Sequence, residues 1–301
     1  MKPADLIRLL SLAAIWGASF LFMRLLVPQL GAMPTAFLRV ALSVVGLLAL
    51  LAVLRCSWDF HGKFGRTLLI GVVSSGIPTA MYSLAALVLP AGYSAIFNAT
   101  TPLMGVLVGA LFYSEALSAA KSAGVLLGLA GVALLTRTGP VAFDLQLLWG
   151  AAACLTATTC YGFSSFMTKR WISERGGLDA RLVALGSQLG ATLCLLPVFA
   201  YGAAEMPLAP LAQPQVWLAL AGLGFLCTAF AYIIYFRLIA DVGPLKTLAV
   251  TFLIPPFGVF WGVLLLDESL SWAHLQGGLL IAAALWLVLR PARPLPQAEI
   301  S

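Results

Sequence analysis

The chain has 301 residues, of which 61% are hydrophobic and only 9% are charged, and its formal net charge is +6. Soluble domains carry about 25% charged residues, so this composition excludes a soluble enzyme as well as disordered, coiled-coil and collagen-like proteins. The hydrophobic runs continue unbroken for about 20 residues, the length at which an α-helix crosses a bilayer, and they lack the alternation typical of transmembrane β-strands.

Hydrophobic runs separated by proline, glycine and charged residues predict ten transmembrane helices, so the expected fold class is an all-α polytopic membrane protein. The first run follows Lys2 and Arg8, as in a signal peptide. It continues to about Val27, which is too long for a signal sequence, so we expect an uncleaved helix. The predicted spans are residues 5–27, 33–54, 67–87, 92–113, 120–137, 145–169, 178–201, 215–237, 243–266 and 272–290.

The positions of lysine and arginine predict the orientation of these spans. With the N-terminus in the cytoplasm, 14 of the 17 basic residues lie at the inner edge of the membrane. Arg24 and Arg137 lie at the outer edge, and Arg39 lies within a span. An even number of spans then places both termini in the cytoplasm. The membrane we expect is the inner membrane of a bacterium. Because the basic residues form no groove-binding cluster, we expect no nucleic-acid partner.

Residues that could carry redox, metal or catalytic chemistry are scattered. The five cysteines have no metal-ligand spacing, and their odd number argues against a disulfide framework. His61 and His274 lie in unrelated predicted loops without catalytic partners. We therefore expect no metal, no cofactor and no enzymatic activity.

An internal repeat organises the chain. Moving the sequence along itself by 153 positions aligns residues 102–137 with 255–290 without a gap, and 15 of the 36 pairs are identical. Chance among leucines and alanines does not explain the matches Pro102/Pro255, Gly105/Gly258, Gly109/Gly262, Glu115/Glu268 and Arg137/Arg290. We predict two five-helix units, residues 1–140 and 141–301. Because five is odd, the second unit enters the membrane from the opposite side, as in many secondary transporters.

Short motifs follow one another in a fixed order along nearly the whole chain. They are Ile15-Trp16-Gly17-Ala18-Ser19-Phe20, Pro34 to Arg39, Thr101-Pro102 to Leu117, Thr228-Ala229-Phe230-Ala231-Tyr232 and Pro255 to Leu270. In this ordered set the chain resembles the drug/metabolite transporter superfamily, in its ten-span branch of EamA-type permeases, and most of all the aromatic amino-acid exporters. The resemblance implies a basket of helices around a central cavity, with the fifth and tenth spans at the periphery.

The middle of the predicted spans contains no Asp, Glu, Lys or His. A proton relay of carboxylates, an acidic site for cationic drugs or a phosphate pocket would each need such groups, so a neutral or zwitterionic solute is favoured. Tyrosine and tryptophan can hold an ammonium group or stack on a ring, although packing explains such residues equally well. The candidate substrate-binding residues are Trp16, Ser19, Tyr82, Asn98, Thr101, Tyr161, Ser164, Gln188, Tyr232 and Trp261.

Prolines and one arginine within the spans could help to bind the carboxylate of a solute. Pro78, Pro102 and the Pro255-Pro256 pair interrupt helical hydrogen bonding and can free backbone groups to meet a carboxylate. Arg39 lies about 9 Å into its span at roughly 1.5 Å per residue. It either extends to the outer surface or faces the cavity and attracts a carboxylate. Glu115, at a span end, is expected to be a turn or cap residue.

The function that these features favour is a secondary transporter that exports amino acids, aromatic ones among them, or similar small neutral or zwitterionic metabolites. Alternating access would arise when one repeat rocks against the other. A multidrug or sugar-type permease of the same fold is the alternative. The expected partners are a small-molecule substrate and the lipid bilayer, and the expected oligomeric state is a monomer.

Overall fold

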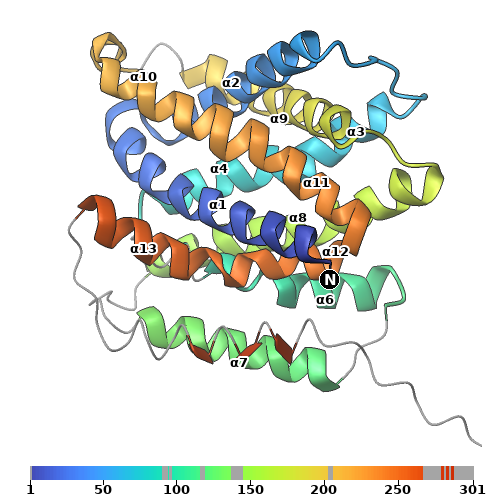
Figure 1. The fold of residues 1–301 in the computed structure, drawn as a ribbon. Coiled ribbons are helices and arrows are strands. Elements are labelled where there is room, and N and C mark those ends of the chain that lie inside the picture. The colour runs from blue at the N-terminus through green and yellow to red at the C-terminus, as the bar shows by residue number, and fades with distance from the viewer. Residues whose placement is uncertain are drawn as a thin grey trace, which may run out of the picture.

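The computed structural model shows a bundle of helices (Figure 1). No β-strand occurs in the residues that it describes, so the all-helical part of the predicted fold class is confirmed. The described residues are 2–89, 97–115, 119–136, 145–202 and 206–266, with isolated positions at 94, 279–280, 283–284 and 286–287.

The helices of the first half follow the predicted spans. A single residue, Gly31, separates the first two helices, and its φ of +89° is a backbone conformation that glycine adopts without strain. The third span changes from α- to π-helical geometry and back. The elements are α1 (Pro3–Leu30), α2 (Ala32–Val53), α3 (Phe64–Gly71), the π-helical η1 (Val72–Gly76), α4 (Ile77–Ala85), α6 (Thr101–Phe112) and α7 (Ala119–Thr136). Figure 1 shows α7 at one edge of the bundle, where the resemblance places the fifth span.

The second half repeats this arrangement in part. Its eighth predicted span also contains a π-helical stretch, and its ninth contains a short 3-10 turn. The elements are α8 (Leu145–Trp171), η2 (Ser173–Arg175), α9 (Ala180–Gly202), η4 (Ala209–Ala212), α10 (Pro214–Ala221), the π-helical η5 (Gly222–Phe230), α11 (Ala231–Val242), α12 (Pro244–Leu248), η6 (Ala249–Phe252) and α13 (Ile254–Leu266).

Several helical stretches of the described chain are suited to crossing a membrane. Five are long and apolar enough by length and composition, and they coincide with the first, second, third, seventh and eighth predicted spans. The predicted span 272–290 lies almost entirely outside the described residues, as does Glu268. The number of ten spans and the inverted repeat therefore stay predictions. The five stretches are Pro3–Leu30, Ala32–Val53, Phe64–Ala85, Ala180–Gly202 and Pro214–Val242.

Glycines bring the third span and α9 into close contact. A side chain at Gly71 would overlap the carbonyl oxygen of Ser187, and one at Gly190 would overlap that of Leu68. Small residues of this kind allow transmembrane helices to approach until their backbones touch. The contact fixes η1, which follows α3 directly, against the middle of α9.

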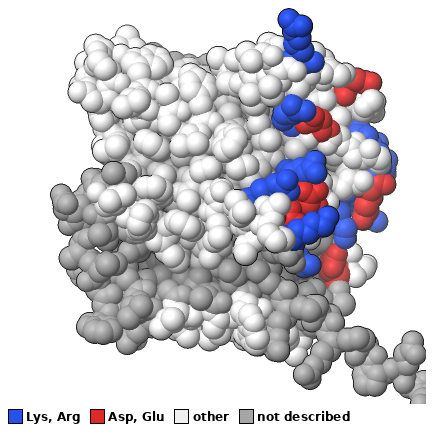
Figure 2. Space-filling view, in the orientation of Figure 1, with Lys and Arg blue, Asp and Glu red and all other residues white. Residues whose placement is uncertain are grey.

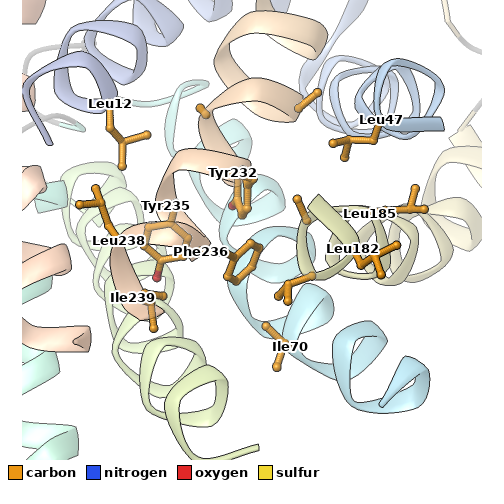
Figure 3. Close-up of a cluster of buried hydrophobic side chains, with 14 of the residues drawn as sticks. Leu12, Leu47, Ile70, Leu182, Leu185, Tyr232, Tyr235, Phe236, Leu238 and Ile239 are labelled. Atoms are coloured by element: carbon orange, nitrogen blue, oxygen red, sulfur yellow. The ribbon is translucent and has the colours of Figure 1, made fainter. Parts of the chain in front are cut away.

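A cluster of buried hydrophobic side chains fills the bundle beside the aromatic residues of α11 (Figure 3). Its members come from α1, α2, α3, α9 and α11 among other elements. Along α1, Leu9 and Leu12 lie between Arg8 and Trp16; along α11, Phe236 and Ile239 follow the tyrosines and precede Asp241. We call Leu9, Leu12, Phe236 and Ile239 the inner cluster. Along both helices these four residues lie between the cavity-lining aromatic residues and a charged residue.

On the face that Figure 2 shows, the charged side chains of the described residues gather at one edge of the molecule. We call this the charged end. Here Arg8 pairs with Asp241 at 2.9 Å and Lys169 pairs with Glu115 at 3.2 Å. Each pair joins one half of the chain to the other. The sequence predicted only a turn or cap role for Glu115. In the structure its carboxylate also binds Lys169 at the end of α8.

Candidate functional site

A cavity lies between the two halves of the chain. Its lining includes nine residues of the first half and seven of the second, and aromatic and hydroxyl side chains predominate. The space open to the centre of a water molecule is about 60 Å³, enough for a few waters. An aromatic amino acid is larger, so its entry requires the walls to move apart. The lining residues are Trp16, Ser19, Phe20, Met23, Arg39, Thr79, Tyr82, Asn98, Thr101, Tyr161, Tyr232, Tyr235, Leu248, Val250, Thr251 and Ile254.

Seven of the ten predicted site residues line this cavity. They come from α1, α4, α8 and α11 and from the chain around the start of α6, so the fold brings together residues that are more than 200 positions apart. The seven are Trp16, Ser19, Tyr82, Asn98, Thr101, Tyr161 and Tyr232.

The other three predicted residues lie outside the lining. The Ser164 hydroxyl donates to the carbonyl of Tyr161 at 3.1 Å, behind the cavity wall. Gln188 is fully buried on α9, where its Oε1 accepts hydrogen bonds from Ser43 and Ser75. Trp261 connects α13 to α1, because its indole N–H donates to the carbonyl of Ala14 at 2.9 Å.

The lining also contains residues that sequence reasoning did not select, and helical spacing could have found several of them. Phe20 and Met23 follow Trp16 by four and seven residues, which places all three on one face of α1. Tyr235 lies three residues after Tyr232 on α11 by the same rule. The hydrophobic residues of η6 and α13 carry no such signal, because their spans are apolar on all sides.

Two groups of aromatic rings line the cavity. The ring of Trp16 lies 6.0 Å from that of Tyr232 and 5.5 Å from that of Tyr235. Across the cavity, Tyr82 stacks near Tyr161 at 6.3 Å with an interplanar angle of 23°, and Phe20 meets Tyr82 edge-on. Such pairs hold each other in fixed orientations. The wall combines the first and third spans of one half with the sixth and eighth of the other.

Prolines explain how two of the polar wall residues are held. Pro78 has no N–H to give to the carbonyl of Ser74 one turn earlier, and the helix widens to η1 there. The hydroxyl of Tyr232 donates to this freed carbonyl at 2.7 Å. In the same way Pro102 frees the carbonyl of Asn98, which accepts from the Thr101 hydroxyl. The freed backbone groups are acceptors already satisfied by hydroxyls, so they are not available to bind a carboxylate.

Arg39 faces the cavity, which decides between the two orientations that the sequence left open. Its Nε donates to the Thr228 hydroxyl at 2.8 Å, and Nη1 lies 3.5 Å from the sulfur of Met23. No carboxylate of a described residue pairs with it. The described residues also contain no group of three or more His, Cys, Asp or Glu that could bind a metal.

Comparison with known proteins agrees with this architecture. The model of the EamA-like transporter family matches residues 6–137 and 148–290. The chain belongs to the EamA-like transporter family. It is therefore a multi-pass membrane transporter of the drug/metabolite transporter superfamily, and family membership indicates transport and not enzymatic catalysis.

Individual relatives are distant. A "probable terminal-alkyne amino-acid exporter" of Streptantibioticus cattleyicolor is 27% identical over 201 residues, which cover 67% of this chain and 65%, slightly under two thirds, of that protein. An uncharacterized transporter of Bacillus subtilis, YoaV, is 21% identical over 93% of this chain and 94% of its own. A solved crystal structure matches with a TM-score of 0.72 and 16% identity over 96% of this chain and 97% of that one, which shows a shared fold.

Proposed function

We propose that this transporter exports amino acids, aromatic ones among them, or similar small neutral or zwitterionic metabolites across a bacterial inner membrane. The observation that carries the proposal is the ring-lined cavity between the two halves. Tyrosine and tryptophan faces attract an ammonium group with about 2 kcal/mol when water is excluded, and they stack on aromatic side chains. The amino-acid exporter among the relatives supports the same substrate class.

Alternating access is the mechanism we propose. The units 1–140 and 141–301 would rock against each other as inverted repeats, so that the cavity opens to one side at a time. The charged end would face the cytoplasm, with both termini, because basic residues concentrate on the inner side. When the cavity opens to the cytoplasm, the ion pairs between the halves and the inner cluster must separate.

The lining of the cavity also bears on energy coupling. Among the described residues that line it, none is a carboxylic acid or a histidine. A proton-coupled carrier normally holds such a group at membrane depth. We therefore expect flux to follow the substrate gradient, with no requirement for an imposed proton gradient. Proteoliposomes with and without a pH difference would measure this directly, and flux that depends strictly on the pH difference would contradict it.

Transport by the purified protein tests the proposed function. Proteoliposomes loaded with unlabelled phenylalanine should take up labelled phenylalanine in exchange, and empty liposomes should not. A competition panel of amino acids, cationic dyes and sugars then identifies the preferred class. Inhibition by amino acids supports the proposal. Inhibition by dyes or sugars alone would favour the alternative, a multidrug or sugar-type permease, and the absence of flux for every amino acid would contradict the substrate class.

A further inference from the structure

Among the described residues that line the cavity, Arg39 is the one with a charged side chain. It reaches the cavity because α2 packs closely against η5. A side chain at Gly224 of η5 would lie 2.7 Å from Cβ of Leu42 and 3.3 Å from the Arg39 carbonyl oxygen, so only a glycine allows this approach. The short distance between the helices directs the long arginine side chain along η5 and into the space between the halves.

Thr228 fixes the direction of the guanidinium group. The threonine hydroxyl donates its hydrogen to the carbonyl of Leu223 at 2.7 Å, five residues earlier in the π-helical stretch. Its lone pairs are then left to accept from Nε of Arg39 at 2.8 Å. With Nε held in this way and Nη1 near the Met23 sulfur, Nη2 makes no hydrogen bond to a described residue.

The charge of Arg39 has no counter-ion in the described structure. At the charged end, by contrast, Arg8 and Lys169 pair with carboxylates. A cation away from bulk water is costly unless an anion or water offsets it. Trp16 and Asn98 also line the cavity, and neither the Trp16 indole N–H nor the Asn98 amide N–H group makes a hydrogen bond to a described residue. A cation among donors fits a ligand group that has negative charge and only acceptors.

We infer that Arg39 binds the carboxylate of the transported solute, so that the carboxylate is required for binding and the ammonium group is not. This inference rests on the proposed function, because it takes the cavity as the transport site. The planar guanidinium is suited to a carboxylate, and a charge-assisted hydrogen bond in a partly buried site is about twice as strong as a neutral one. The rings supply contact for the rest of the solute; their attraction for an ammonium group adds to binding, but no carboxylate of a described lining residue pairs with that group.

Three ligands with the same ring test this inference on the unmodified protein. They are L-phenylalanine, 3-phenylpropionate, which lacks the ammonium group, and phenethylamine, which lacks the carboxylate. Calorimetric titration of the purified transporter should show binding of the first two and roughly ten- to hundredfold weaker binding of phenethylamine. Phenethylamine that binds as tightly as 3-phenylpropionate would overturn the inference. Phenyl phosphate that binds more tightly than 3-phenylpropionate would also overturn it, in favour of a phosphate site.

Variants of Arg39 test whether this residue causes the requirement for a carboxylate. Arg39→Gln should weaken 3-phenylpropionate at least about tenfold and leave phenethylamine unchanged, while Arg39→Lys should fall between. Arg170→Gln is the matched control, because Arg170 lies at the charged end over the ring of Tyr113, 5.8 Å away. Equal affinity of Arg39→Gln and wild type for 3-phenylpropionate would overturn the assignment. Should Arg39→Gln fail to fold, the comparison of ligands on the wild type decides alone.

The inference and the proposed function fail in different ways. If 3-phenylpropionate binds and phenylalanine does not, aromatic amino acids are not the substrate but carboxylate recognition stands. If phenylalanine and phenethylamine bind equally well, the amino-acid proposal stands and carboxylate recognition is wrong. If none of the three binds, carboxylate recognition is wrong, and so is the part of the proposed function that includes aromatic amino acids.

Discussion

The cavity and the charged end use the same kinds of side chains in opposite ways. At the charged end, Arg8 and Arg237 both pair with Asp241, and the pair of Arg8 with Asp241 joins the two halves of the chain. In the cavity, Arg39 meets a hydroxyl and a sulfur and no carboxylate of a described residue. Charges that are paired within the protein hold its halves together, whereas a charge that lacks an internal partner is available to a solute.

The two regions also differ in what their aromatic side chains contact. Near the charged end, Phe236 is a buried member of the hydrophobic cluster, with 2% of its surface exposed (Figure 3). Tyr82 and Tyr232 line the cavity, and their hydroxyls are held by hydrogen bonds to Asn98 and to the carbonyl of Ser74. A wall with fixed rings that faces a cavity is suited to reversible contact with a ligand.

The largest expected effect comes from removal of a cavity ring. Trp16→Ala deletes the ring that contacts both Tyr232 and Tyr235, and phenylalanine exchange in proteoliposomes should fall about tenfold or more. Trp16→Phe, which keeps a ring, should retain most of the activity. Trp58→Ala is the control outside the cavity, where the side chain is 51% exposed. Unchanged exchange by Trp16→Ala would remove the distinction between the two regions.

Loss of one hydroxyl in the wall should lower stability. Tyr232→Phe leaves the Ser74 carbonyl, freed by Pro78, without its hydrogen-bond donor. An unsatisfied buried acceptor costs about 1–3 kcal/mol, so the melting temperature in detergent should fall by several degrees. Tyr201→Phe is the matched control, because Tyr201 is 94% exposed. Equal melting temperatures for the two variants would show that the freed carbonyl is not a structural requirement.

Loss of an ion pair at the charged end should loosen that end without affecting ligand affinity. Asp241→Asn removes the carboxylate that pairs with Arg237 and one of the two that pair with Arg8, which keeps Asp5. Exposed pairs contribute up to about 1 kcal/mol, so hydrogen–deuterium exchange at the end of α11 should rise by up to about fivefold. Phenylalanine affinity should stay the same. A change in affinity with no change in exchange would reverse the roles given to the two regions.

The smallest effect concerns pH at the charged end. A hydrogen bond from Arg181 lowers the pKa of Asp179 below its usual value, and its carboxylate also accepts from the backbone N–H of Arg181 at the start of α9. A lowered pKa in the folded state means that the stabilisation is complete above the unfolded pKa, about 4, and is lost as pH falls through the folded pKa. Both side chains are about one third exposed, so the loss is small.

Thermal unfolding between pH 7 and pH 3 checks this assignment. Wild type and Asp179→Asn should differ by a constant small amount above pH 5, and the difference should shrink below pH 4. A difference that grows as the pH falls would contradict it.

The sequence predicted the all-helical class and most of the cavity wall, and the reasons are specific. Trp16 and Tyr161 lie near the middle of their spans, and depth is readable from a hydrophobic run. Rotation about the helix axis is not readable from a run that is apolar on all sides. Ser164 and Trp261 therefore have the right depth but lie behind the wall.

Local geometry set a second limit on sequence reasoning. The π-helical stretches η1 and η5 change the direction of every side chain after them, and hydropathy does not report them. Pro78 was a visible signal for the first stretch, and no proline marks the second. The orientation of Arg39 depended on η5 and on Gly224, so it could be decided only in three dimensions.

The most direct test of the cavity as the transport route is access to one position in it from both sides of the membrane. Ser19→Cys, with the five native cysteines replaced, puts a thiol in the lining. Right-side-out and inside-out vesicles are then treated with a membrane-impermeant maleimide. The account predicts labelling from both sides and slower labelling in the presence of phenylalanine; labelling from one side only, or at a rate that phenylalanine does not change, would contradict it.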